Sequence, residues 1–216
     1  MSATMSPATV VICAGLQQRA ATPAGVPVTW VVDLDTLVRR GTLAPGSAVA
    51  LEIDPAWLAS RQALRQAVVR ARHAAPGLEA AVLRGPTLAH HAVLAEEGIR
   101  VVVVDAFADV GRGSRRPAPA GWACRNVAWG LWEVRACPPR RSAAWAWLPG
   151  LPAPRRGGLH VADVGTDSIG RLRRLLDWAG RGVAGRRAVA VTLADLPAIL
   201  EGRRSVAVGA SVLKAA

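Results

Sequence analysis

Short apolar runs rich in valine and isoleucine recur along the chain, separated by stretches in which apolar residues have helical spacing. Such runs are typical of strands buried on both faces, as in a parallel sheet covered by helices. The runs that predict strands are Thr9–Ala14, Val28–Val32, Ala48–Ile53, Ala80–Leu83, Ile99–Val104, Val127–Val134, Leu159–Val164 and Ala188–Thr192. The pattern predicts an α/β fold with a mostly parallel sheet.

Between these runs, apolar residues return every three or four positions, which is the spacing of an amphipathic helix. Pro76-Gly77 and Gly98 end two of the helical stretches, and Pro86 can open one of them. The predicted helices cover residues 55–75, 86–97, 168–179 and 194–200, with a short piece through Val38 that Asp33 can cap. The alternation of strands and helices indicates βα units.

Two segments have no apolar periodicity and are predicted to be loops rich in arginine, proline and tryptophan. They lie near residues 106–122 and 138–158. The strands that flank these loops are too few to form a second core. We therefore expect one domain over residues 1–216 with a barrel-like arrangement of βα units.

Basic residues are concentrated in one part of the chain. Lys and Arg number 27 against 15 Asp and Glu, which gives a net charge of +12. Residues 112–187 contain fifteen arginines and four acids, for a net charge of +11, whereas residues 1–111 are neutral. Lysine occurs once, so codon usage of a GC-rich genome explains why the basic residues are arginine. It does not explain why acids are scarce in that segment.

The cysteines and the apolar runs indicate the compartment. Cys13, Cys124 and Cys137 contain no CxxC pair, so neither a disulfide framework nor a cysteine zinc site is indicated. No apolar run reaches the roughly 18 residues that a membrane span needs. We expect a reduced, cytoplasmic protein without a membrane span.

The order of segments from Val10 to Leu200 resembles the polysaccharide deacetylase family. The likeness lies in VTWVV at 28–32, AAVLRGP at 80–86 with EGIRVV after the next helix, GLWEV at 130–134, and Leu159-His160. The NodB-homology domain of that family is a distorted (β/α) barrel. The resemblance implies a single distorted (β/α) barrel of the glycoside hydrolase and deacetylase type, with a role in carbohydrate metabolism.

The sequence departs from the family at the residues that carry the family's chemistry. Active members, as the resemblance implies, hydrolyse the carbon–nitrogen amide bonds of N-acetylated sugars. Their divalent metal, such as zinc, is held by residues of an Asp-Asp pair and an HxxxH segment. Here the first strand ends in CAGL at 13–16, and the third reads LEIDP at 51–55, so those ligands are absent. We expect no metal or other cofactor, and a diverged or non-catalytic protein.

Arg84, His160 and Asp54 are the candidate site residues. The resemblance implies that Arg84 orients a catalytic carboxylate and that His160 is the general acid for the leaving amine. Asp54 and Arg84 follow strands, at the mouth where such barrels hold their sites. Each residue has a structural alternative: Arg84 would pair with Asp54 or Asp105, Asp54 would cap the next helix, and His160 would be a hydrogen-bonded strand residue.

Tryptophans are interleaved with arginines in the basic segment, and both residue types can contact sugar rings, nucleobases or acidic polymers. The candidate ligand-binding residues are Trp132, Glu133, Arg115 and Arg116. The structural alternative is that the tryptophans pack in the core or loops while the arginines form a solvated rim.

Two functions follow from these observations. The first is a polysaccharide deacetylase-like protein, diverged or non-catalytic, with a cleft at the barrel mouth for a carbohydrate or another polar small molecule. The second is a protein that binds an anionic polymer, either nucleic acid or acidic glycan, through segment 112–187. An active hydrolase with relocated metal ligands is a third possibility, for which no motif is present. The sequence does not indicate an oligomeric state.

Overall fold

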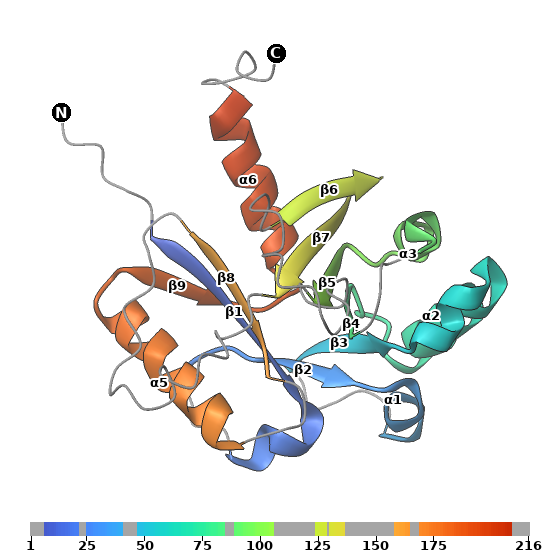
Figure 1. The fold of residues 1–216 in the computed structure, drawn as a ribbon, viewed down its shortest axis with the longest axis horizontal. Coiled ribbons are helices and arrows are strands. Elements are labelled where there is room, and N and C mark those ends of the chain that lie inside the picture. Colours follow the sequence, from blue (N-terminus) through green and yellow to red (C-terminus); the bar gives the residue numbers. More distant parts are fainter. Residues whose placement is uncertain are drawn as a thin grey trace, which may run out of the picture.

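The computed structural model describes residues 7–21, 25–40, 47–84, 89–105, 124–128, 130–136, 158–164 and 169–208. The strands in these residues are β1 (Ala8–Gly15), β2 (Thr29–Val32), β3 (Ala48–Ile53), β4 (Ala80–Leu83), β5 (Val101–Asp105), β6 (Cys124–Ala128), β7 (Leu131–Ala136), β8 (Leu159–Asp163) and β9 (Ala188–Val191). They form one sheet in the order β6-β7-β5-β4-β3-β2-β1-β8, with β9 also paired to β1 (Figure 1). Paired strands are parallel, except for the antiparallel pair β6 and β7. The predicted α/β class is therefore confirmed.

Strand β1 is the centre of one half of the sheet. Its residues 8–11 pair with β9, residues 13–15 pair with β2, and residues 9–13 pair with β8. All eight of its residues are buried. The uninterrupted apolar sequence of this strand therefore reflects contact with neighbours on both edges and both faces.

The sheet curls, and its two faces are covered by different helices. The described helices are α1 (Leu34–Arg40), α2 (Arg61–Ala74), α3 (His91–Glu96), α5 (Ile169–Ala184) and α6 (Leu196–Val208), with 3-10 turns η1 (Leu16–Ala21) and η2 (Pro55–Ala59). Helices α1, α2, α3 and α5 pack on the convex face and form the outer core with residues such as Ile12 and Leu83. Leu196 and Leu200 of α6 join the inner core on the concave face, together with Val11 and Val103.

The curled sheet is a half-barrel, so the expected distorted (β/α) barrel is present only in part and is not closed. Closure would require β7 to pair with β8, and Cα atoms of these two strands do come within 8 Å of each other. The second edge of β7 is instead hydrogen-bonded to β6, and among the described strands β8 pairs with β1. The hairpin strand β6 thus occupies the edge that closure would use.

This hairpin replaces the single strand predicted over residues 127–134. Gly130 lies between β6 and β7 with φ of +83°, a left-handed conformation that glycine adopts without strain. The register between the two strands shifts between Asn126 and Ala128. Because VAWGLWEV is apolar on both sides of the glycine, its hydrophobic pattern does not indicate a turn there.

Two helix starts also differ from their predictions. The predicted helix over residues 55–75 divides at Ser60, whose backbone is extended and whose hydroxyl accepts the N–H of Ala63 at 3.0 Å. The helix predicted from Pro86 begins at His91. The predicted cap at Asp33 is confirmed, since its carboxylate accepts the N–H of Thr36 at 2.8 Å. Partial burial opposes ionisation of Asp33, but the hydrogen bonds that its carboxylate accepts outweigh this effect and hold its pKa below the usual value.

A buried hydrogen bond joins the concave face of β2 to the turn after β9. The hydroxyl of Thr29, which is fully buried, accepts the N–H of Leu193 at 2.8 Å. We expect Thr29→Val to lower the free energy of unfolding by about 1–3 kcal/mol, because the buried N–H loses its acceptor. Thr29→Ser keeps the hydroxyl and should retain most of that stability in a urea titration. Equal losses in the two variants would contradict this account.

Candidate functional site

Arg84 binds two carboxylates at the carboxyl ends of the parallel strands. Its Nη1 lies 2.8 Å from Oε1 of Glu52. Its Nε and Nη2 donate to the two carboxylate oxygens of Asp163, at 2.8 and 3.1 Å. The pairing with Asp163 is thus bidentate, which fixes the orientation of the guanidinium plane. We call Arg84, Glu52 and Asp163 the Arg84 cluster.

The strand pattern explains why these three side chains meet. Side chains two residues apart on a strand point to the same face. Glu52 follows Ala50 by two residues, Arg84 follows Val82, and Asp163 follows Val161; these three apolar residues all belong to the inner core. Each polar residue is the next inward position at the carboxyl end of its strand. The cluster therefore sits at the mouth of the half-barrel, directly above its inner core.

Burial and charge in the cluster act against each other. Burial alone would lower the pKa of Arg84, but the hydrogen bonds and charge of Asp163 and the charge of Glu52 outweigh it and raise that pKa. The Arg84 side chain is 24% exposed, Asp163 13% and Glu52 34%. Arg84 is therefore a fixed cation, and Glu52 is the carboxylate most open to solvent.

Cys13, near the end of the first strand, lies beside the cluster. It is paired in register with Asp163 of β8, and its side chain belongs to the inner core. Burial raises the pKa of the Cys13 thiol far above its usual value; the charge of Asp163 adds to the rise, and Arg84 opposes it. A thiol with a raised pKa is protonated at neutral pH and is therefore a poor nucleophile.

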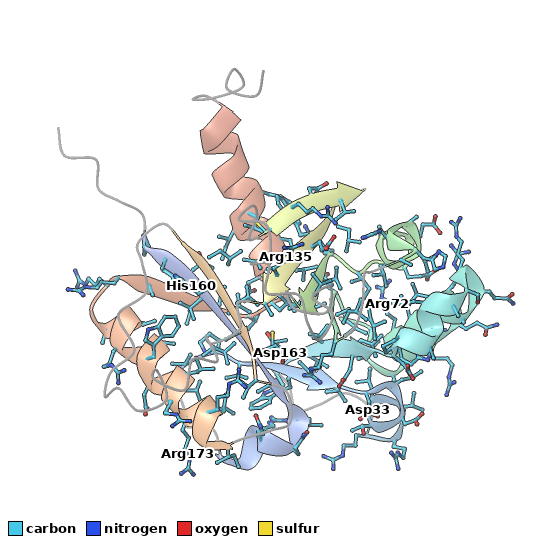
Figure 2. All side chains as sticks on the ribbon, in the orientation of Figure 1. Asp33, Arg72, Arg135, His160, Asp163 and Arg173 are labelled. Atoms are coloured by element: carbon cyan, nitrogen blue, oxygen red, sulfur yellow. The ribbon has the colours of Figure 1, made fainter. Side chains whose placement is uncertain are left out.

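His160, the second candidate site residue, does not lie on the same face of the sheet as Arg84. His160 and Asp163 are three residues apart on β8, so their side chains point to opposite faces of the sheet. The ring of His160 meets the ring of Trp178 on α5 edge to face, with centroids 5.7 Å apart. Figure 2 labels both His160 and Asp163 along β8. The histidine belongs to the helix-covered convex side, and the cluster belongs to the concave side.

Asp54, the third candidate site residue, is a helix-capping residue. Its carboxylate accepts the N–H of Ala56 at 2.8 Å and so caps η2. Of the two roles expected for Asp54, capping is therefore the one observed. The expected pairing of Arg84 with Asp54 is wrong, since Arg84 pairs with Glu52 and Asp163. The side chain of Asp105, the other expected partner, lies outside the described part of the structure.

Trp132 and Glu133, two predicted ligand-binding residues, lie on opposite faces of β7. Trp132 lies in the inner core and is 5% exposed. It is paired in register with Val101, at the amino end of β5 and away from the mouth. Glu133 is buried and accepts Nη2 of Arg125 at 2.8 Å, with Nε2 of His91 at 3.6 Å. Neither residue joins the Arg84 cluster, and Trp132 packs in the core, as the alternative for the tryptophans expects.

The remaining candidates, Arg115 and Arg116, lie outside the described residues, as do both predicted loops. In the described part of the chain, no group of three or more His, Cys, Asp or Glu side chains could hold a metal ion. The residues at the mouth do not fit the divalent metal that the resemblance implies, since Glu52 and Asp163 are bound to Arg84, whose positive charge repels a cation.

Neither Asp163 nor Glu52 is among the candidate site residues taken from the sequence. A signal for Asp163 exists, because Leu159, Val161 and Asp163 alternate along one face and the carboxylate ends that face. What the sequence lacks is any indication that β8 lies opposite β4. The partner of Arg84 therefore required the three-dimensional arrangement.

No protein-family model, curated protein or solved structure matches this chain. Among the described helices, none combines the length and the apolar character that crossing a bilayer requires.

The buried thiol of Cys13 gives a direct test of the site's geometry. We expect iodoacetamide at about pH 8 to modify the partly exposed Cys124 and to leave Cys13 unmodified, because the raised pKa and full burial keep Cys13 protonated and inaccessible. Peptide mass spectrometry distinguishes the two sites. In denaturant both should react. Native labelling of Cys13 as fast as that of Cys124 would show that the mouth is open at β1.

Proposed function

We propose that this chain is a diverged, non-catalytic relative of the polysaccharide deacetylases. In this proposal it binds a carbohydrate, or another hydroxyl-rich small molecule, at the Arg84 cluster. The observation that carries the proposal is a fixed guanidinium with two carboxylates at the mouth of a half-barrel of parallel strands. The motif resemblance at residues 28–32 and 80–86 supports the family.

The position of the cluster supports a binding role. Sheets of parallel strands bind their ligands at the carboxyl ends of the strands, where the following loops surround the site. Arg84, Glu52 and Asp163 follow or end β4, β3 and β8 on the inward face. A purely structural ion pair has no need to be at this end. We therefore place the proposed ligand-binding site at the carboxyl ends of the strands.

The chemistry of the cluster fits hydroxyl groups. Carboxylates accept hydrogen bonds from hydroxyls, and a guanidinium that is already satisfied keeps those carboxylates ionised and oriented. Glu52 is one-third exposed, so its carboxylate can accept a ligand hydroxyl while remaining bound to Arg84. The cluster carries a net charge of −1, which disfavours anionic ligands at this site.

The lack of catalysis in this proposal rests on the residues beside the cluster. Cys13 stands where the family has carboxylates, and its thiol is protonated and buried. The histidine that resembles the family's general acid, His160, faces Trp178 instead of the mouth. The thiol of Cys13, which forms no disulfide, agrees with the reduced, cytoplasmic setting that we propose.

Binding of chitotetraose, the tetramer of N-acetylglucosamine, tests the proposal. We expect calorimetry to detect binding to the wild-type protein and the Glu52→Gln variant to bind at least about tenfold more weakly, because a charge-assisted hydrogen bond becomes a neutral one. Glutamine can still bond to Arg84, so the fold should be retained. We expect no release of acetate.

The matched control is Glu79→Gln. Glu79 is a solvent-exposed residue that precedes β4 at its amino end, opposite to the mouth, and lies 4.0 Å from Arg100. Its substitution should leave chitotetraose affinity unchanged. Absence of binding, or equal weakening by the two substitutions, would contradict a hydroxyl-binding mouth. Acetate release in buffer containing zinc would contradict the non-catalytic assignment.

A further inference from the structure

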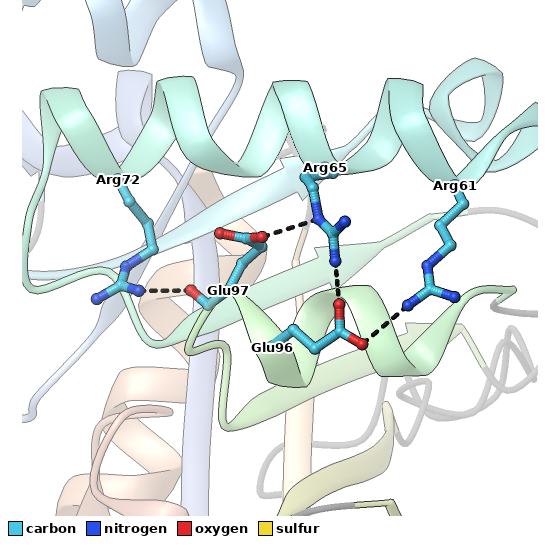
Figure 3. A network of polar contacts seen from close by, with 5 residues as sticks. All are labelled: Arg61, Arg65, Arg72, Glu96 and Glu97. Atoms are coloured by element: carbon cyan, nitrogen blue, oxygen red, sulfur yellow. Dashed lines mark hydrogen bonds and ion pairs between the residues drawn. The ribbon is translucent and has the colours of Figure 1, made fainter.

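Two of the four arginines of helix α2 form ion pairs with acids. Arg61 and Arg65 bind the carboxylate of Glu96, and Arg65 also binds Glu97 at 3.0 Å (Figure 3). Arg72 donates to the backbone carbonyl of Glu97, and Arg70 is exposed. The charges of Arg61 and Arg65 are therefore offset by Glu96 and Glu97.

The arginines of helix α5 and the turn after it are arranged differently. We call Arg173, Arg174, Arg181, Arg186 and Arg187 the α5 patch; all five side chains are exposed. Among the described residues, none forms an ion pair with any of them. Asp177 is the one acid within α5.

Helical spacing places the charges of α5 on one side. Arg173 and Arg181 are four residues from Asp177 in either direction and Arg174 is three, so these positions share the solvent-facing side. The opposite side is buried against the sheet through Leu172, Leu175, Leu176 and Ala179. Arg173 and Arg181 are eight residues apart, so these charges span about 12 Å of the helix axis. Arg173, Arg174 and Arg181 therefore form a row of guanidiniums on one side of the helix, with Asp177 between them.

Codon usage does not account for this contrast. A GC-rich genome supplies arginine to α2 and α5 alike, but Arg61 and Arg65 of α2 have ion-pair partners, whereas Asp177, the one acid of α5, forms no ion pair with the patch among the described residues. The whole segment of residues 112–187 shares the excess, with fifteen arginines and four acids. Unpaired charge of one sign costs stability through self-repulsion, and a polyanion would offset that cost.

We propose that the α5 patch binds the phosphate backbone of a nucleic acid. Guanidiniums match phosphate oxygens in geometry and bind them with two hydrogen bonds each. Double-stranded DNA presents about one charge per 1.7 Å of its axis, so a row of this length can contact several phosphates at once. Such contacts position a duplex without reading its sequence.

Two other partners fit the patch less well. An amphipathic helix that binds a membrane inserts its apolar side, and that side of α5 is buried in the outer core. An acidic peptide would anchor apolar side chains in the groove of about 530 Å³ beside Val26, Leu176, Gly180 and Val183. The arginine side itself carries no large apolar residue between Arg173 and Arg181. These observations favour a partner recognised by charge alone.

The test is the salt dependence of binding to a fluorescent DNA duplex of about 20 base pairs. For three to five phosphate contacts, we expect the logarithm of the association constant to fall with the logarithm of salt concentration with a slope between about −2.7 and −4.5. The triple variant Arg173→Gln, Arg174→Gln, Arg181→Gln should reduce the magnitude of that slope by about 2.7. Glutamine has a helix propensity close to that of arginine, so α5 should persist.

The control triple variant is Arg61→Gln, Arg65→Gln, Arg70→Gln, which removes the same total charge from α2 and should leave the slope unchanged. Binding that does not depend on salt, or equal effects of the two triple variants, would overturn the proposal. Gly180→Leu fills the groove, and the nearest atom to an added Cβ is Cγ2 of Val26 at 3.9 Å. DNA binding should survive this change; its loss would overturn the proposal in favour of an anchored peptide.

Discussion

The structure depends on the ion pair that Arg84 makes across the concave face of the sheet. Arg84 follows β4 and Asp163 ends β8, and three strands lie between them in the sheet. Adjacent strands are 4.7–4.9 Å apart, so β4 and β8 would be about 19 Å apart in a flat sheet. The guanidinium and the carboxylate are 2.8 Å apart instead. The pair therefore requires the curl of the sheet, and it joins β4 to β8 at the mouth of the half-barrel.

Much of the fold was predictable because β-branched residues form the strands and both faces of the sheet are buried. The strand at Ala48–Ile53 is observed as predicted, and β1 extends its prediction by one residue at each end. The errors have a common cause, since local pattern does not report which distant elements meet. Gly130 sits in an apolar run that hides a hairpin, and that hairpin keeps the barrel open. Likewise Asp163 alternates with Val161 along its strand, but only the curl brings it to Arg84.

The same molecule uses its arginines in three ways. Arg84 is held by carboxylates at the mouth, two of the four arginines of α2 form ion pairs with Glu96 and Glu97, and the arginines of the α5 patch face solvent with no ion pair among the described residues. The net charge of +12 is therefore the sum of parts of the molecule that use their arginines differently. A hydroxyl-rich ligand at the mouth and a polyanion along α5 would occupy separate surfaces. The two proposals can fail or hold independently.

A double-mutant cycle between Arg84 and Asp163 tests the central claim most directly. The free energy of unfolding in urea would be measured for Arg84→Gln, Asp163→Asn, the double variant and the wild type. The account predicts a coupling energy of about 1–3 kcal/mol, as for a partly buried, charge-assisted pair. The same cycle for the exposed pair Arg61 and Glu96 should give less than about 1 kcal/mol. Additive effects at Arg84 and Asp163 would contradict the claim that this pair holds the curl.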